Sequence, residues 1–248
     1  MGRRDLAPAD LRDGQGRRFR GQIGETFERP ELNPYVSIHK EYPEQIIPAS
    51  QGAGLGARRA ELFGREAPLH LEIGSGNGFY LSGMAALHPE ADWVGLEIRF
   101  KRVVIAAKKL QELGLRNARV VRYDAFLIED LFGPGTLAGI HVNHPDPWPK
   151  GRHEKHRLLG PAFLDAAARM LAPDGELRVK TDFAPHVAAV LAALPGRPFT
   201  VLGKVEDVAR DGAPWPDEVV TNYQRKSGEA GRPVLALRLR RDAPGDPR

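Results

Sequence analysis

The stretch that decides the fold is Leu69-His-Leu-Glu-Ile-Gly-Ser-Gly-Asn-Gly78. It is an apolar run of strand length that carries one acid, Glu72, and leads into three closely spaced glycines, Gly74, Gly76 and Gly78. Residues 79–87 continue with the apolar spacing of a helix. A strand that runs into a glycine turn and then a helix is typical of α/β sheets, where missing Cβ atoms let a ligand lie against bare backbone.

The spacing of the glycines separates several kinds of nucleotide-binding turn. The dinucleotide motif places glycines in the order G-x-G-x-x-G, but Phe79 stands where its third glycine is required. No Lys-Ser or Lys-Thr pair follows, so a phosphate-binding loop of that type is not matched either. The order Glu-x-Gly-x-Gly-x-Gly resembles motif I of the class I S-adenosylmethionine-dependent methyltransferases; a plain tight turn is the alternative.

Composition indicates a globular protein of 248 residues, 42% hydrophobic and 27% charged, which fits one α/β domain with an appendage or two small domains. The net charge of +4 suits a polyanionic partner, although arginine-rich composition also arises from GC-rich genomes. The absence of cysteine excludes disulfides and a cysteine nucleophile. No apolar run reaches the roughly 18 residues that span a bilayer and no signal-peptide core is present, so we expect no membrane partner and a cytoplasmic location.

Working outward, apolar strands alternate with helical patterns along most of the chain. Strands are predicted at 69–73, 93–96, 118–123, 139–143, 176–180, 199–205 and 234–239, with helices at 79–87, 100–113, 160–171 and up to residue 194. This alternation predicts an α/β, Rossmann-like fold with a doubly wound, mostly parallel sheet and an antiparallel pair of strands at its edge. We assign residues 66–242 to this domain and residues 243–248 to a tail.

Residues 1–65 are predicted to form a basic, proline-rich N-terminal extension. The first 30 residues are rich in Arg and Gly and lack periodicity, which favours a flexible tail or a basic arm that lies on nucleic acid. Four prolines between residues 30 and 50 indicate an extended loop, and residues 54–65 fit a short helix.

Acidic residues stand at or just past the ends of five predicted strands. Ligands bind outside the carboxyl ends of the strands in such a sheet, so these residues are the informative ones. They are Glu72, Glu97, Asp124, Asp146 and Asp182. Loops are often polar at any one of these places, but five acids together indicate a shared site.

In a methyltransferase of this class, three of these acids have natural roles. Glu97 lies about 20 residues beyond the glycine turn, where a carboxylate can accept hydrogen bonds from both hydroxyls of a ribose. Asp124 can accept from an adenine amino group. Glu72 lies beside the glycines, near the place of the methionine part and its cationic sulfonium.

An unusual segment follows the strand at 139–143 and reads His144-Pro-Asp-Pro-Trp-Pro-Lys-Gly-Arg-His-Glu-Lys-His-Arg157. Its prolines and glycine fix a rigid loop. The loop holds a carboxylate, a large aromatic ring and a cation in Asp146, Trp148 and Lys150. A hydrogen-bond acceptor beside a stacking surface suits a nucleobase pocket.

Basic residues continue this segment, namely Arg152, Lys155 and Arg157. A compact basic patch beside a base pocket suits phosphates, with a solvated run of charges as the alternative. His153 and His156 lack a convincing carboxylate or third ligand, so we expect no metal site.

The segment 146–157 resembles the bacterial tRNA (guanine-N7)-methyltransferases, which modify guanine 46 in the variable loop. Supporting matches are 72–78, Gly95-Leu-Glu97, 117–125, Lys180-Thr-Asp182 and Thr221-Asn-Tyr-Gln224, so the resemblance covers residues 68–240. It implies a class I methyltransferase that uses S-adenosylmethionine and acts on tRNA. By motif, it implies that the cofactor is held by Glu72, Gly74, Gly76, Gly78, Glu97, Asp124 and Ala125, that Asp146 is the catalytic residue, and that substrate contacts Lys150, Asp182, Thr221 and Gln224.

Three positions depart from the family pattern. The family usually has an aromatic residue where His144 stands, Arg where His156 stands, and Glu where Gln224 stands. An amide at position 224 still forms hydrogen bonds but carries no charge. Alternative functions are methylation of another RNA base or of an exocyclic amine, methylation of a small molecule, or RNA binding by a decayed methyltransferase fold. The sequence is compatible with both a monomer and a homodimer.

Overall fold

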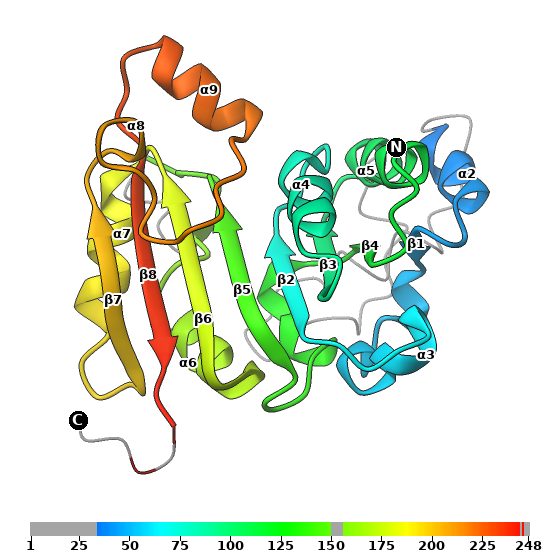
Figure 1. The fold of residues 1–248 in the computed structure, drawn as a ribbon, viewed down its shortest axis with the longest axis horizontal. Helices are drawn as coiled ribbons and strands as arrows, with labels where there is room; N and C mark the ends of the chain where they lie inside the picture. The colour runs from blue at the N-terminus through cyan, green and yellow to red at the C-terminus, as the bar shows by residue number, and fades with distance from the viewer. Residues whose placement is uncertain (1–33, 150–155, 244, 246–248) are drawn as a thin grey trace, which may run out of the picture.

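The computed structural model describes residues 34–149, 156–243 and 245. An eight-stranded sheet runs through these residues in the order β1-β4-β3-β2-β5-β6-β8-β7 (Figure 1). The strands are β1 (Ile46–Ile47), β2 (Leu69–Ile73), β3 (Asp92–Glu97), β4 (Ala118–Arg122), β5 (Leu137–Asn143), β6 (Leu171–Thr181), β7 (Phe199–Val205) and β8 (Leu235–Arg241). Neighbouring strands from β1 to β6 are parallel, and β8 is antiparallel to both β6 and β7.

Helices cover both faces of the sheet. The α-helices are α2 (Tyr35–Ile38), α3 (Arg59–Phe63), α4 (Phe79–Leu87), α5 (Phe100–Glu112), α6 (Pro161–Met170), α7 (Ala184–Ala193), α8 (Val208–Asp211) and α9 (Asn222–Glu229). Short 3-10 helices are η2 (His39–Glu41), η3 (Ala49–Gln51), η4 (Leu55–Arg58) and η5 (Ala125–Asp130). Helices α4 and α5 lie in front of the sheet in Figure 1, and α6 and α7 lie behind it.

Two large apolar cores follow from this layering, and a smaller third cluster lies around Val208 and Trp215. The larger core joins alternate strand residues such as Leu71 and Val179 to Leu164 of α6. The second core packs α4 and α5 against the opposite face, around Trp93 and Leu110. Side chains alternate between the faces of a strand, so the polar residues between the larger core's strand positions point toward the α4 side.

The predicted doubly wound sheet with an antiparallel pair at its edge is confirmed. The pair is β7 and β8, and β8 lies between β6 and β7, so β7 is the edge strand. The predicted short helix within residues 54–65 corresponds to η4 and α3.

Strand β1 and helix α9 are two of the elements that the sequence does not predict. Strand β1 adds Ile46 and Ile47 to the sheet beside β4. The domain boundary predicted at residue 65 stays a prediction. Helix α9 begins after Thr221, whose hydroxyl accepts a hydrogen bond from the backbone N–H of Gln224 at 3.0 Å. Within the described ranges, no helix combines the length and the apolar character needed to cross a membrane. The predicted basic arm at residues 1–30 lies outside the described residues.

Candidate functional site

The predicted site residues that the structure describes gather at one edge of the sheet. The strands β2, β5 and β6 all point to the upper edge in Figure 1, where α4, α5 and α9 also lie. Because parallel strands end on the same side, the residues that follow β2 to β6 in the chain meet there.

The three glycines of the turn after β2 share a left-handed backbone conformation but differ in what surrounds them. All three have positive φ, at 75° for Gly74, 55° for Gly76 and 73° for Gly78, a region that favours glycine. A Cβ on Gly78 would lie 2.8 Å from the Cβ of Ala106, so this glycine lets α4 begin close against α5. A Cβ on Gly74 would meet no described atom within 4 Å. Gly74 therefore leaves an open side on which a ligand can lie.

Glu97, at the end of β3, is buried and firmly oriented. One carboxylate oxygen accepts hydrogen bonds from the backbone N–H groups of Ile98 and Arg99, both at 2.9 Å. The other accepts from Gly76 at 3.1 Å, which ties the glycine turn to β3. A carboxylate offers about four acceptor sites, so the oxygen facing Gly76 can still receive a ligand hydroxyl.

Glu72, in β2, is buried but incompletely paired. Asn143 at the end of β5 donates a hydrogen bond of 3.3 Å to its Oε1, while Oε2 is buried and has no hydrogen-bond partner among the described residues. Burial raises the pKa of Glu72 to about 7, against the hydrogen bond from Asn143, the charge on Lys180 and the backbone N–H of Leu81. Unpaired buried carboxylate oxygens are costly, so this oxygen is a candidate ligand-binding atom.

Asp124 and Ala125 follow β4. One oxygen of Asp124 accepts a hydrogen bond of 3.0 Å from the backbone N–H of Phe126 and so caps η5. Ala125 packs partly buried against the larger core. Because they follow β4, Asp124 and Ala125 lie at the same edge of the sheet as Glu72 and Glu97.

Asp146 lies in the rigid loop after β5 and is exposed. The loop begins with His144 at φ 48° and turns again at Trp148 with φ 41°. Arg157 anchors it by donating two hydrogen bonds, of 3.3 and 3.2 Å, to the carbonyl oxygen of Trp148. The predicted phosphate-contacting residues Lys150, Arg152 and Lys155 lie outside the described residues.

Asp182 follows β6 and connects the loop to α9. Its carboxylate accepts hydrogen bonds from Ser227 at 2.8 Å and Arg232 at 3.3 Å. On its other side, Nδ1 of His144 lies 3.7 Å from Oδ1 of Asp182, and the His144 ring stacks on Tyr223 of α9 with centroids 6.0 Å apart. Burial lowers the pKa of His144 even though Asp182 acts to raise it.

Both polar atoms of the Gln224 side chain are hydrogen-bonded within the protein, which its sequence motif does not predict. Its Oε1 accepts a hydrogen bond of 2.9 Å from Nζ of Lys180, and its Nε2 donates one of 2.9 Å to Glu218. Lys180 also donates to Glu218 at 2.8 Å and to the carbonyl oxygen of Val219 at 3.1 Å. Lys180 is fully buried, and these three bonds use all three of its N–H groups. We call Lys180, Glu218 and Gln224 the lysine cluster.

Sequence reasoning missed four residues of this edge: Asn143, Lys180 and Glu218 as side-chain partners, and Arg102 of α5. The strand-end rule points to Asn143, which directly follows Val142 at the end of β5. Glu218 and Arg102 carry no local signal, because their partners lie far away in the sequence.

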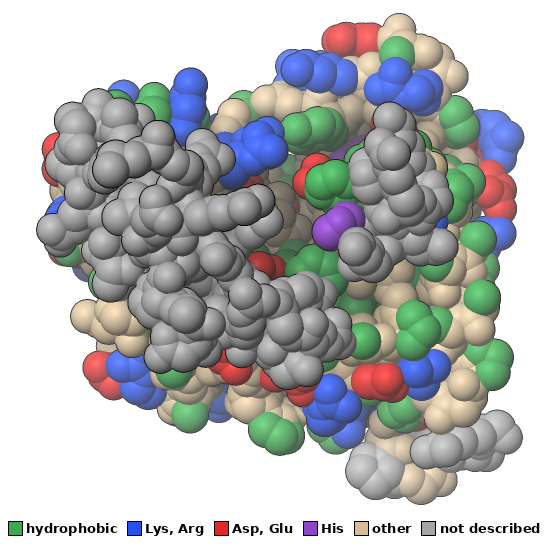
Figure 2. All heavy atoms as spheres, turned by 180° about the vertical axis from the view of Figure 1, so that it is seen from behind, with side chains coloured by type: hydrophobic (Ala, Val, Ile, Leu, Met, Phe, Trp, Pro, Cys, Tyr) green, Lys and Arg blue, Asp and Glu red, His purple; other side chains and the backbone are tan. Residues whose placement is uncertain are grey.

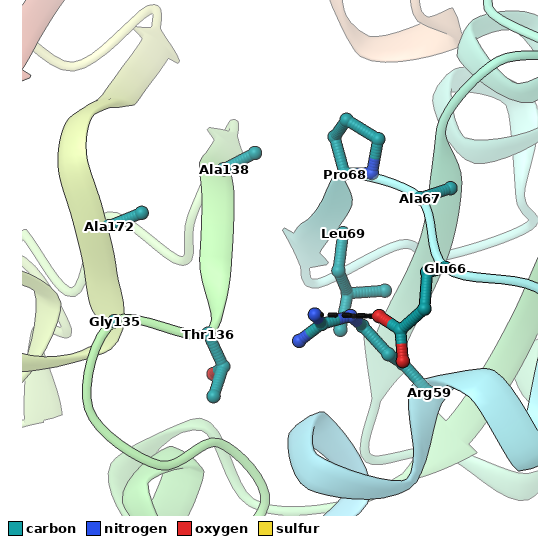
Figure 3. Close-up of a pocket in the computed structure, with 9 residues that line it drawn as sticks. All are labelled: Arg59, Glu66, Ala67, Pro68, Leu69, Gly135, Thr136, Ala138 and Ala172. Carbon is teal, nitrogen blue, oxygen red and sulfur yellow. Dashed lines mark hydrogen bonds and ion pairs between the residues drawn. The ribbon is translucent and has the colours of Figure 1, made fainter.

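A hollow of about 360 Å³ lies at the opposite end of the strands, where Figure 3 shows Arg59 paired with Glu66 beside Leu69, Gly135 and Thr136. It contains none of the predicted site residues. Among the residues that the structure describes, no group of three or more His, Asp or Glu could hold a metal ion.

Similar sequences are methyltransferases. A family model described as "Putative methyltransferase" matches residues 66–237. The tRNA (guanine-N(7)-)-methyltransferase of Geobacillus kaustophilus is 36% identical over 193 residues, which are 78% of this chain and 87% of that protein. The protein of the same name from Listeria welshimeri is 36% identical over 216 residues, 87% of this chain and 96% of that protein.

Solved structures with a similar fold are also methyltransferases. The 16S rRNA methyltransferase KamB has a TM-score of 0.56 at 19% identity, over 75% of this chain and 94% of that chain. A 16S rRNA (adenine(1408)-N(1))-methyltransferase from Catenulisporales acidiphilia, solved with cosubstrate SAM, has a TM-score of 0.51 at 16% identity, over 79% and 98%. At these identities the likeness shows a shared fold.

Proposed function

Since the chain belongs to the tRNA (guanine-N(7)-)-methyltransferase family, we infer that it transfers the methyl group of S-adenosylmethionine to N7 of guanine in tRNA. The observation that carries this conclusion is the 36% identity to a protein of that name over 87% of this chain. We propose guanine 46 of the variable loop as the target base.

The residues at the glycine turn fit the cofactor. When bound, S-adenosylmethionine supplies an electrophilic methyl group on a sulfonium. We assign the open side of Gly74 and the unpartnered oxygen of Glu72 to the cationic methionine part, because a buried carboxylate gains most from a positive partner. Glu97 would hold the ribose and Asp124 the adenine, with Gly76, Gly78 and Ala125 shaping the walls.

Asp146 would act on the base and not on the cofactor. Guanine N7 has a free lone pair and loses no proton when it is methylated, so that atom needs no general base. Asp146 can accept hydrogen bonds from the guanine N1–H and N2 amino groups, and its negative charge favours the positive charge that develops on the base. We therefore assign it positioning and electrostatic stabilisation.

Further contacts to tRNA are proposed around this base site. We propose that Asp182, Thr221 and Gln224 contact the substrate from the α9 side, and that Lys150, Arg152, Lys155 and Arg157 meet phosphates. Figure 2 shows Lys and Arg side chains along the upper edge, over α9, where Arg225 and Lys226 are exposed. We also propose that the basic arm predicted at residues 1–30 lies on tRNA, and that the enzyme works in the cytoplasm with its tRNA substrate.

The test is incubation of the purified protein with labelled S-adenosylmethionine and unmodified bulk tRNA, followed by nucleoside analysis. We expect the label in 7-methylguanosine, mapped to the variable loop. Label in another nucleoside or on an exocyclic amine would contradict the assigned atom. Transfer of label to small molecules without tRNA would contradict the assigned substrate.

A further inference from the structure

Arg102 lies in the first turn of α5, beside the glycine turn. Its Nη1 lies 3.6 Å from the place that a Cβ on Gly76 would take, and its Nη2 donates a hydrogen bond of 3.3 Å to the hydroxyl of Tyr223. This hydrogen bond, followed by the charges of Glu97 and Asp146, raises the pKa of Arg102. Arg102 therefore reaches from α5 to α9, where the charges of Glu97 and Asp146 act on it.

The fold alone gives no reason for a cation at this place. The apolar face of α5 is formed by residues such as Val103 and Leu110, and Arg102 lies off that face. The N-terminal end of a helix carries partial positive charge, which disfavours a cation in the first turn. Of the five N–H donors of Arg102, the described structure gives one to Tyr223, a neutral partner.

The cofactor brings a group that the acids of the site cannot bind. Its methionine part ends in an ammonium and a carboxylate. Glu72 and Glu97 attract the ammonium but repel the carboxylate. Lys180, a buried cation whose charge acts on Glu72, already donates all of its N–H groups to Glu218, Gln224 and the carbonyl oxygen of Val219.

We propose that Arg102 binds the carboxylate of the methionine part of S-adenosylmethionine, and that Tyr223 holds the guanidinium in position. The proposal rests on the proposed function, because it takes the cofactor from it. An arginine can offer two parallel N–H donors to a carboxylate, which adds direction to the charge attraction. Arg102 would thus complement Glu72, which faces the cationic end of the same ligand.

The test uses two ligands that differ only in the carboxylate, S-adenosylmethionine and its decarboxylated analogue. Their dissociation constants would be measured by calorimetry, without tRNA, for the wild-type protein, Arg102→Gln and Arg102→Lys. Arg102→Gln should weaken S-adenosylmethionine binding about 10- to 100-fold and leave the analogue within about twofold. Arg102→Lys keeps the positive charge but not the pair of parallel N–H donors. Its loss of affinity should therefore be smaller, and again confined to S-adenosylmethionine. Lys101→Gln, which removes the neighbouring exposed cation, should change neither constant.

Equal losses for both ligands, or no loss for either, would overturn the role of Arg102 while leaving the methyltransferase assignment intact. A wild-type protein that binds neither ligand would overturn both. Thermal unfolding of each variant separates a local loss from misfolding, and Arg102→Lys serves as the folded comparison because it preserves length and charge.

Discussion

Glu72 on β2 and Lys180 on β6 are two buried charged residues on the same face of one sheet, but they differ in how fully their polar atoms are hydrogen-bonded. Lys180 donates to Glu218, to Gln224 and to a backbone carbonyl, so none of its N–H groups is left over. Glu72 has one hydrogen bond, from Asn143, and one oxygen without a partner among the described residues. Folding alone accounts for the first arrangement, whereas the second calls for a ligand.

The electrostatics of the two residues agree with this distinction. Burial lowers the pKa of Lys180, and the charge of Glu218 and its hydrogen bond offset part of that effect. Burial raises the pKa of Glu72 from 4.5 to about 7, and its hydrogen bond does not compensate. A shift of that size corresponds to about 3 kcal/mol of folding free energy that is missing when Glu72 is ionised. A cationic ligand beside Glu72 would recover part of it.

Removing the ammonium of Lys180 should have the largest effect on stability. Lys180→Met keeps a similar volume but leaves Glu218 without its buried partner. We expect the free energy of unfolding in urea to fall by about 3 to 5 kcal/mol. The double variant Lys180→Met, Glu218→Gln, which removes both charges, should recover part of the loss. A change below about 1 kcal/mol in the single variant would contradict a structural role for the lysine cluster.

Asp146 extends the comparison to an exposed acid. Because its side chain is exposed and is assigned to the base, Asp146→Ala should lower kcat about 100-fold and leave stability unchanged. The affinity for S-adenosylhomocysteine, measured by calorimetry, should stay within about twofold of wild type. An equal collapse of cofactor affinity would show that Asp146 belongs to the cofactor site instead.

The pH dependence of cofactor binding sharpens the role of Glu72. Its carboxyl must be ionised to attract the ammonium, so the affinity for S-adenosylhomocysteine should fall about tenfold per pH unit below about pH 7 and level off above it. The free energy of unfolding should change with pH in the opposite direction, because the pKa of Glu72 is higher in the folded than in the unfolded protein. The stabilising contribution of the protonated Glu72 is fully present below pH 4.5 and is lost as the pH rises through about 7. Calorimetry across this range measures the first effect, and Glu72→Gln should abolish the slope.

Gln224 should give the smallest effect. Gln224→Ala removes one of the three hydrogen bonds of Lys180, so we expect a loss of about 1 kcal/mol in the free energy of unfolding. The motif predicts a substrate contact at the same residue, which would appear as a higher KM for tRNA. Unchanged stability with a raised KM would separate Gln224 from the lysine cluster, and Asn222→Ala in the same helical turn is the matched control.

The parts of the fold that the sequence predicts are those with a local pattern. The strands β2 to β5 are apolar runs, and the acids at their ends are adjacent to them in the chain. Strand β1 has two residues, too few to show a period. Helix α9 buries only Ser227 and has no apolar face to detect, so its first sign is the cap at Thr221.

The pairing of side chains in the site follows from topology and not from local pattern. Lys180 meets partners 38 and 44 residues further along the chain, and Arg102 meets Tyr223 121 residues away. No spacing rule links such positions. The sequence identifies the acids of the site but cannot say that Glu72 is left unpaired while Gln224 is fully engaged.

The most direct test of this account compares Glu72→Gln with the wild-type protein in two measurements on the same samples, urea unfolding and calorimetric binding of S-adenosylhomocysteine at a pH above about 8. We predict that affinity falls about 10- to 100-fold while stability is equal or higher, because a neutral amide replaces an unpaired buried charge. A variant that binds the ligand as well as wild type but is less stable would contradict the claim that Glu72 is reserved for the cofactor.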